Sequence, residues 1–160
     1  IAFGHETGSQ KILDSINKKT SIEQNYRSIE YAKKHGIKVK SFLMIGLPGE
    51  TKETIADTEK FIQTGGMDDF QLAIYYPYKG TKIRDAIDNN ENTQDLFFVK
   101  EGLGAYGQKG GKSESVVRTK ELSSEDLLRI RDELVNKHHP NSHKQMWFHD
   151  IHLTSQSEYG

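Results

Sequence analysis

The chain has 160 residues, of which 34% are hydrophobic and 28% are charged, and its formal net charge is -1. This length suggests one domain with a sizeable core, and the charge gives no electrostatic argument for a nucleic-acid or anionic-membrane partner. The absence of cysteine excludes disulfides, a thiolate nucleophile and cysteine-ligated metals within the chain. No apolar run is long enough to span a membrane and no signal peptide is evident, so we expect a cytoplasmic protein.

The first half alternates between predicted strands and helices. Strands are expected to end at residues 4, 45 and 76, after the apolar runs 1–4, 37–45 and 70–76. Helical spacing of apolar residues predicts helices between these runs and after the last one. Each connection is long enough to join parallel strands, so the carboxyl ends of the strands should lie along one edge of a sheet. The uninterrupted apolar run 42–45 is typical of a parallel strand that is covered on both faces.

The turn after residue 45 is the first candidate site. Gly46 and Gly49 allow a tight turn, and Thr51 is a good N-cap for the next helix. A purely structural turn would use the same residues. A phosphate site at this helix N-terminus is an alternative, although the turn lacks the Gly-Lys-Ser/Thr ending of a P-loop. Glu50 is expected to be a helix N-terminal carboxylate rather than a catalytic one.

A pair of carboxylates, Glu6 and Glu50, also permits an acid–base hypothesis of the kind used in glycoside hydrolysis. Their separation does not follow from the sequence. Five histidines lie at the end of the chain, where their spacing matches no standard metal site, so surface histidines are expected and no metal ligand is assigned. They are His138, His139, His143, His149 and His152.

The second half has a different character. Residues 89–122 form a long connection with few periodic apolar residues, in which Val116 and Val117 suit a short strand. A helix is expected over 124–138, capped by Ser123 or Ser124 and stopped by Pro140. The glycine-rich stretch from Gly102 to Gly111 is a candidate lid or substrate-side loop.

Three segments in chain order carry a family resemblance: residues 4–10 (GHETGSQ), 45–51 (IGLPGET) and 76–81 (YPYKGT). Together they resemble the second half of a radical S-adenosylmethionine (SAM) domain, and residues 115–119 (SVVRT) resemble the cobalamin-binding or methylthiotransferase-like branch. The resemblance implies an α/β fold, namely strands four to six of a partial (β/α)6 barrel over residues 1–88, followed by a helical and irregular extension over 89–160.

The resemblance also implies cofactors and an activity. In that family a 4Fe-4S cluster reduces SAM, and the resulting 5'-deoxyadenosyl radical abstracts hydrogen from the substrate. The three cluster cysteines belong to a loop after the first strand. Because this chain begins inside an apolar segment and has no cysteine, we expect it to be a piece of a longer protein that is inactive alone and pairs with the rest of that protein. Cobalamin use and the substrate stay open.

The resemblance assigns SAM contacts to nine residues and assigns no catalytic residue. Glu6 corresponds to a polar residue that faces SAM, Ser9 supports that turn, and Lys18 corresponds to a basic residue that pairs with the SAM carboxylate. The adenine side is assigned to Ile45, Gly46, Leu47, Pro48, Tyr76 and Pro77. Some relatives have an acidic residue where this chain has Phe42, so one polar contact is missing.

A different class of function remains open: a barrel-derived binding or assembly module that performs no chemistry. An upstream Cys-x3-Cys-x2-Cys motif in the same polypeptide would favour the enzyme. Half a barrel also leaves strand edges uncovered, so we expect the isolated chain to dimerise, to aggregate or to cover its edge with residues 89–122.

Overall fold

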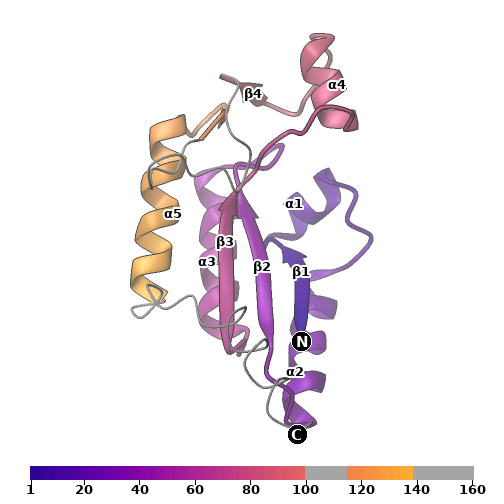
Figure 1. Ribbon diagram of the computed structural model, residues 1–160, viewed down its shortest axis with the longest axis vertical. Helices are drawn as coiled ribbons and strands as arrows, with labels where there is room; N and C mark the ends of the chain where they lie inside the picture. The colour runs from indigo at the N-terminus through magenta and orange to yellow at the C-terminus, as the bar shows by residue number, and fades with distance from the viewer. Residues whose placement is uncertain (100–114, 139–160) are drawn as a thin grey trace, which may run out of the picture.

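The computed structural model describes residues 1–99 and 115–138. Its centre is a parallel sheet of three strands in the order β1 (Ala2–Glu6), β2 (Lys40–Ile45) and β3 (Asp69–Ile74). The connections contain α1 (Gln10–Ser15), α2 (Ile22–Lys34) and α3 (Lys52–Thr64) (Figure 1). The predicted α/β class and the parallel pairing are confirmed. The sheet of the described residues is open, so it does not by itself establish a barrel.

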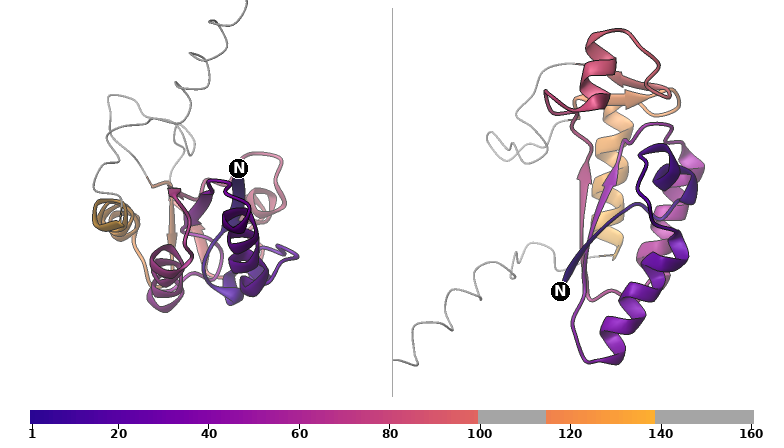
Figure 2. Two further views of the ribbon diagram at one scale, coloured as in Figure 1. Left: turned by 90° about the horizontal axis from the view of Figure 1, so that it is seen from below. Right: turned by 90° about the vertical axis from the view of Figure 1, so that its right-hand side faces the viewer.

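Helices cover one face of this sheet. Figure 2 shows α2 and α3 on the same side of the strands. Burial in β2 alternates accordingly: Ser41, Leu43 and Ile45 are buried, whereas Phe42 and Met44 on the opposite face are only half-buried. The prediction that the run 42–45 is covered on both faces is therefore wrong for the described residues. Uninterrupted hydrophobicity shows that a strand can be buried, but it does not show what covers each face.

Local helix signals decide where the helices begin. Ser21 and Gln24 form a capping box at α2, in which each side chain bonds the other residue's backbone N–H. Thr51 and Thr54 do the same at α3. Thr81 caps α4 (Lys82–Asp88), where its hydroxyl accepts the N–H of Arg84. The predicted cap at Thr51 is confirmed, and Ser21 and Thr81 cap the two other helices.

The C-terminal elements share the core of the sheet. β4 (Leu96–Phe98) and β5 (Val117–Thr119) form an antiparallel pair, and α5 (Ser124–His138) packs against β3 and α3. The predicted helix 124–138 and the strand near Val117 are confirmed, and Ser123 receives the N–H of Asp126 as the cap. β4 was not predicted. One cluster of buried side chains includes Phe61 from α3, Leu43 from β2 and Leu127 from α5.

The predicted lid, Gly102 to Gly111, and the histidines beyond His138 lie outside the described residues. Within the described ranges, no helix is both long enough and apolar enough to cross a membrane. The division of the chain at residue 88 stays a prediction, although α5 and α3 contribute to a common core.

Candidate functional site

The end of β1 differs from a regular strand. β1 continues to Glu6, two residues beyond the predicted end, and its register with β2 shifts between Gly4 and Glu6. Glu6 has a φ of 66°, a left-handed conformation that is costly for a residue with a side chain. Gly4 makes room for the result, because a Cβ at that position would lie 2.8 Å from Oε1 of Glu6. The bulge thus re-aims the Glu6 carboxylate at the carboxyl end of the sheet.

Glu6 and Lys18 form an ion pair. The Nζ of Lys18 donates to Oε1 of Glu6 at 2.8 Å, and the two side chains are 35% and 20% exposed. Lys18 follows α1 in the chain, so the pair joins the end of β1 to the loop before α2. The structure therefore brings together two of the residues that the sequence selected, in a position that solvent and small solutes can reach.

His5 connects this end of β1 to α2 and β2 through two hydrogen bonds. Its Nε2 lies 2.9 Å from Oγ of Ser28 and its Nδ1 lies 2.9 Å from Oγ of Ser41. Since Ser28 donates its own hydroxyl proton to the carbonyl of Asn25, it accepts from His5, which places the imidazole proton on Nε2. Burial, with a smaller contribution from nearby Lys18, lowers the pKa of His5 to about 4. His5 is therefore a neutral structural residue that fixes the backbone beside Glu6.

Ser9 connects α1 to α3 instead of pointing at Glu6. It is buried, and its hydroxyl donates to Oδ2 of Asp57 at 2.8 Å. Next to it, Gly8 lies directly against α3: a Cβ there would be 2.5 Å from the carbonyl oxygen of Asp57 and 2.6 Å from Cβ of Phe61. In the structure Ser9 links the start of α1 to α3, and its assignment as a residue that supports SAM binding stays a prediction.

The turn after β2 is held from inside by Glu50. Gly46 and Leu47 both donate their backbone N–H to Oε2 of Glu50, at 2.5 and 3.0 Å. Glu50 is 2% exposed, and burial raises its pKa to about 7, against the lowering effect of the two amide bonds. Sequence reasoning missed this role, because it placed the carboxylate on the following helix. The pattern that points to it is a glutamate four residues after a turn glycine.

Two alternative hypotheses lose support from this geometry. The amides of Gly46 and Leu47, which a bound phosphate would need, already bond to an internal carboxylate. Glu50 is also too buried to act with Glu6 as an exposed pair of carboxylates. A P-loop-like site and a glycosidase-like pair are therefore both disfavoured.

The remaining adenine-side residues lie at the same edge of the sheet but have other contacts. The side chains of Ile45 and Leu47 are 0% and 1% exposed, and Pro48 accepts the hydroxyl of Ser15 at its carbonyl oxygen, 2.9 Å away. Tyr76 follows β3, and its ring centroid lies 4.7 Å from that of Tyr78. The buried Pro77 accepts from the guanidinium of Arg84 through its carbonyl oxygen. The six residues thus form the edge of the sheet rather than one cluster.

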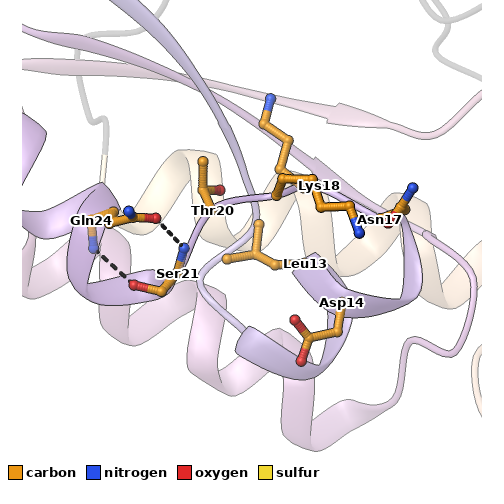
Figure 3. A pocket seen from close by; sticks show the side chains of 8 residues that line it. Leu13, Asp14, Asn17, Lys18, Thr20, Ser21 and Gln24 are labelled. Atoms are coloured by element: carbon orange, nitrogen blue, oxygen red, sulfur yellow. Dashed lines mark hydrogen bonds between the residues drawn. The ribbon is translucent and has the colours of Figure 1, made fainter.

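A polar depression adjoins the ion pair. It has a volume of about 450 Å³, lies between α1 and the start of α2, and includes Lys18 and Thr20 in its lining (Figure 3). All of its lining residues come from α1, the loop that follows it and the start of α2, so none of them belongs to a strand end. The depression is therefore additional space beside Lys18. Among residues 1–99 and 115–138, no group of three His, Cys, Asp or Glu side chains is placed to hold a metal ion.

Residues 1–62 match the model of the Radical SAM superfamily. An anaerobic magnesium-protoporphyrin IX monomethyl ester cyclase of Rubrivivax gelatinosus is 37% identical over 78 residues, which cover 49% of this chain and 14% of that protein. An uncharacterized methyltransferase of Pyrococcus horikoshii is 36% identical over 91 residues, which cover 56% of this chain and 20% of that protein.

A third relative is a tRNA-2-methylthio-N(6)-dimethylallyladenosine synthase of Shewanella putrefaciens, 36% identical over 117 residues that cover 64% of this chain and 23% of that protein. The chain therefore spans between 14% and 23% of the length of these three relatives. The matched residues 1–62 include the bulged end of β1, Lys18 and the turn held by Glu50. Residues 1–62 therefore belong to the radical SAM superfamily, and a relative named for methylthio chemistry matches a longer part of the chain.

Proposed function

We propose that this chain supplies the SAM-facing part of a radical SAM enzyme, corresponding to strands four to six of the family's barrel. The observation that carries the proposal is the ion pair of Glu6 and Lys18 on the bulged end of β1. SAM has an ammonium and a carboxylate attached to the same α-carbon. A carboxylate and an ammonium 2.8 Å apart offer these two groups one partner each.

The residues present fit SAM but not the iron–sulfur cluster. The pair is accessible, its backbone is fixed by the buried His5, and Gly4 leaves room for the carboxylate. When bound, SAM supplies the 5'-deoxyadenosyl group that this family uses for hydrogen abstraction. The cluster needs cysteine thiolates, and the sequence has none. We therefore propose that the cluster ligands belong to the remainder of the same protein, which is the partner of this chain.

Lys18 has the role of a charge partner. Its ammonium holds the Glu6 carboxylate at 2.8 Å, and the same ammonium can turn to a ligand carboxylate, because both side chains keep part of their surface in solvent. Glu6 then accepts from the ligand ammonium. The adenosyl part would extend from this pair along the strand ends toward the turn after β2 and toward Tyr76 and Pro77.

A second function is favoured by one observation, the absence of cysteine. A binding or assembly module derived from the barrel would keep the fold and lose the chemistry. It would have no need of the ion pair at the strand end, so the two functions differ in whether SAM binds.

The test is SAM binding by the complete protein that contains this chain, reconstituted anaerobically with iron and sulfide. Glu6→Gln and Lys18→Met should each weaken SAM binding about tenfold, because each removes one charged hydrogen bond. Lys11→Met, on the exposed face of α1, is the matched control and should bind like wild type. Release of 5'-deoxyadenosine should fall in the same two variants. Wild-type protein that neither binds nor cleaves SAM would instead support the module.

A further inference from the structure

The turn between β2 and α3 is over-determined by its hydrogen bonds. Oε2 of Glu50 accepts from Gly46 and Leu47, and the Glu50 N–H donates to the carbonyl of Leu47 at 3.1 Å. Gly46 has a φ of 79° and Gly49 a φ of 78°. Two glycines in one turn allow the backbone several conformations, since glycine takes positive and negative φ values at no steric cost. A side chain that bonds two consecutive amides selects one shape from those that the glycines allow.

The C-terminal elements hold the same turn from outside. The Gly49 N–H donates to the carbonyl of Gln94 at 2.7 Å. A Cβ on Gly46 would lie 3.1 Å from Leu127 in α5 and 3.3 Å from Val117 in β5. The carbonyl of Pro48 accepts the hydroxyl of Ser15 in α1. The turn therefore lies between two parts of the molecule: the β1–α1 region, which contains the Glu6–Lys18 ion pair, and the C-terminal elements. The Glu50 carboxylate is buried inside this turn.

Burial of the Glu50 carboxylate lowers the free energy of unfolding unless its hydrogen bonds compensate for the lost solvation. Among the described residues, its Oε1 has no hydrogen-bond partner. Burial also raises its pKa to about 7. The hydrogen bonds from the Gly46 and Leu47 amides offset part of this cost.

We propose that Glu50 is a positioning residue, whose carboxylate fixes the Gly46 and Leu47 amides and so sets the turn after β2 in the shape that receives the adenosyl part of the ligand. This inference rests on the proposed function and adds a residue to it. Glu50 acts through the backbone of the turn and has no contact with the ligand, because it is buried. The amino-acid part of the ligand belongs to Glu6 and Lys18 and should not depend on Glu50.

Two small probes separate these parts. 5'-Methylthioadenosine contains the adenosyl group without the amino acid, and methionine contains the amino acid without the adenosyl group. In the complete reconstituted protein, Glu50→Ala should weaken the binding of 5'-methylthioadenosine about tenfold and leave methionine binding within about twofold. Lys18→Met should do the reverse. Glu50→Gln keeps an acceptor oxygen for the two amides and should restore most of the affinity.

Amide hydrogen exchange gives a readout that needs no ligand. Exchange at Gly46 and Leu47 should accelerate in Glu50→Ala and return toward the wild-type rate in Glu50→Gln. Glu53→Ala is the matched control, an exposed glutamate in the first turn of α3, and it should change neither readout.

The outcomes distinguish the inference from the function on which it rests. Wild-type binding of both probes with no difference between Glu50→Ala and Glu53→Ala would overturn the inference alone. Equal weakening of both probes in Glu50→Ala would also overturn it, since a general loss of structure would explain that result. Wild-type protein that binds neither probe nor SAM would overturn the proposed function, and the inference with it.

Discussion

Burial shifts the pKa values of two groups, His5 and Glu50, in opposite directions. Their effects on the pH dependence of stability should therefore cancel. Burial lowers the pKa of His5 from the ordinary 6.5 to about 4 and raises the pKa of Glu50 from 4.5 to about 7. Between pH 4.5 and 6.5, unfolding allows His5 to bind a proton and forces Glu50 to release one. The net number of protons exchanged by the pair is close to zero, so the pair contributes little slope of stability against pH.

Removing either group should reveal the other. For His5, the unfolded state binds more protons, so its contribution to stability is present above pH 6.5 and is lost as pH falls toward 4. For Glu50, the folded state binds more protons, so its contribution is present below pH 4.5 and is lost as pH rises toward 7. Because titration is gradual at each end, either group alone changes the free energy of unfolding by about 2 kcal/mol across this window.

The assay is urea unfolding of the 160-residue chain, followed by circular dichroism at several pH values in this window. Relative to wild type, Glu50→Gln should become more stable as pH rises, and His5→Asn should become less stable as pH rises. Differences from wild type remove the effects of the other histidines and carboxylates, which all variants share. Two variants with the slope of wild type, or two slopes of the same sign, would refute the assignment of a neutral buried His5 and a protonatable buried Glu50.

Two further predictions concern packing. Gly8→Ala should lower the free energy of unfolding by about 3 kcal/mol, because the new Cβ meets the backbone of Asp57 and Thr58 in α3 at under 3 Å. Gly36→Ala, where nothing lies within 4 Å but φ is 72°, should cost only about 1 kcal/mol, and equal losses at both positions would contradict the contact. Leu127→Ala should cost about 3 kcal/mol, since this side chain is 0% exposed in the shared core. Arg129→Ala, on the exposed side of α5, should change stability by less than about 0.5 kcal/mol. Separate unfolding transitions for the two halves in Leu127→Ala would contradict one core.

Local patterns predicted the helices well. The caps at Ser21, Thr51 and Thr81 depend on side chains that bond backbone within one turn, so the sequence contains all the necessary partners. The helix at 124–138 follows from the spacing of its apolar residues in the same way. β4 was missed because three residues in a polar connection carry too little pattern, and its strand conformation depends on pairing with β5 some twenty residues later.

The site was predicted only in part, for a related physical reason. Glu6 and Lys18 were selected separately, and the structure shows that they pair. The bulge that joins them arises from the fit between β1 and β2, which a single strand does not reveal. Glu50 was misplaced because its partners are the amides just before it, and the preference of acidic residues for helix N-termini suggested the opposite direction.

The left-handed backbone at Glu6 has a consequence for evolution and engineering. A glycine at this position would relieve about 1 kcal/mol of strain, and an asparagine would relieve part of it. Selection for thermal tolerance alone, as in a consensus or directed-evolution campaign, would therefore tend to discard this carboxylate. Under the proposed function, glutamate at this position trades some stability of the fold for contact with the ligand. Stabilising libraries built on this protein should leave residue 6 unchanged.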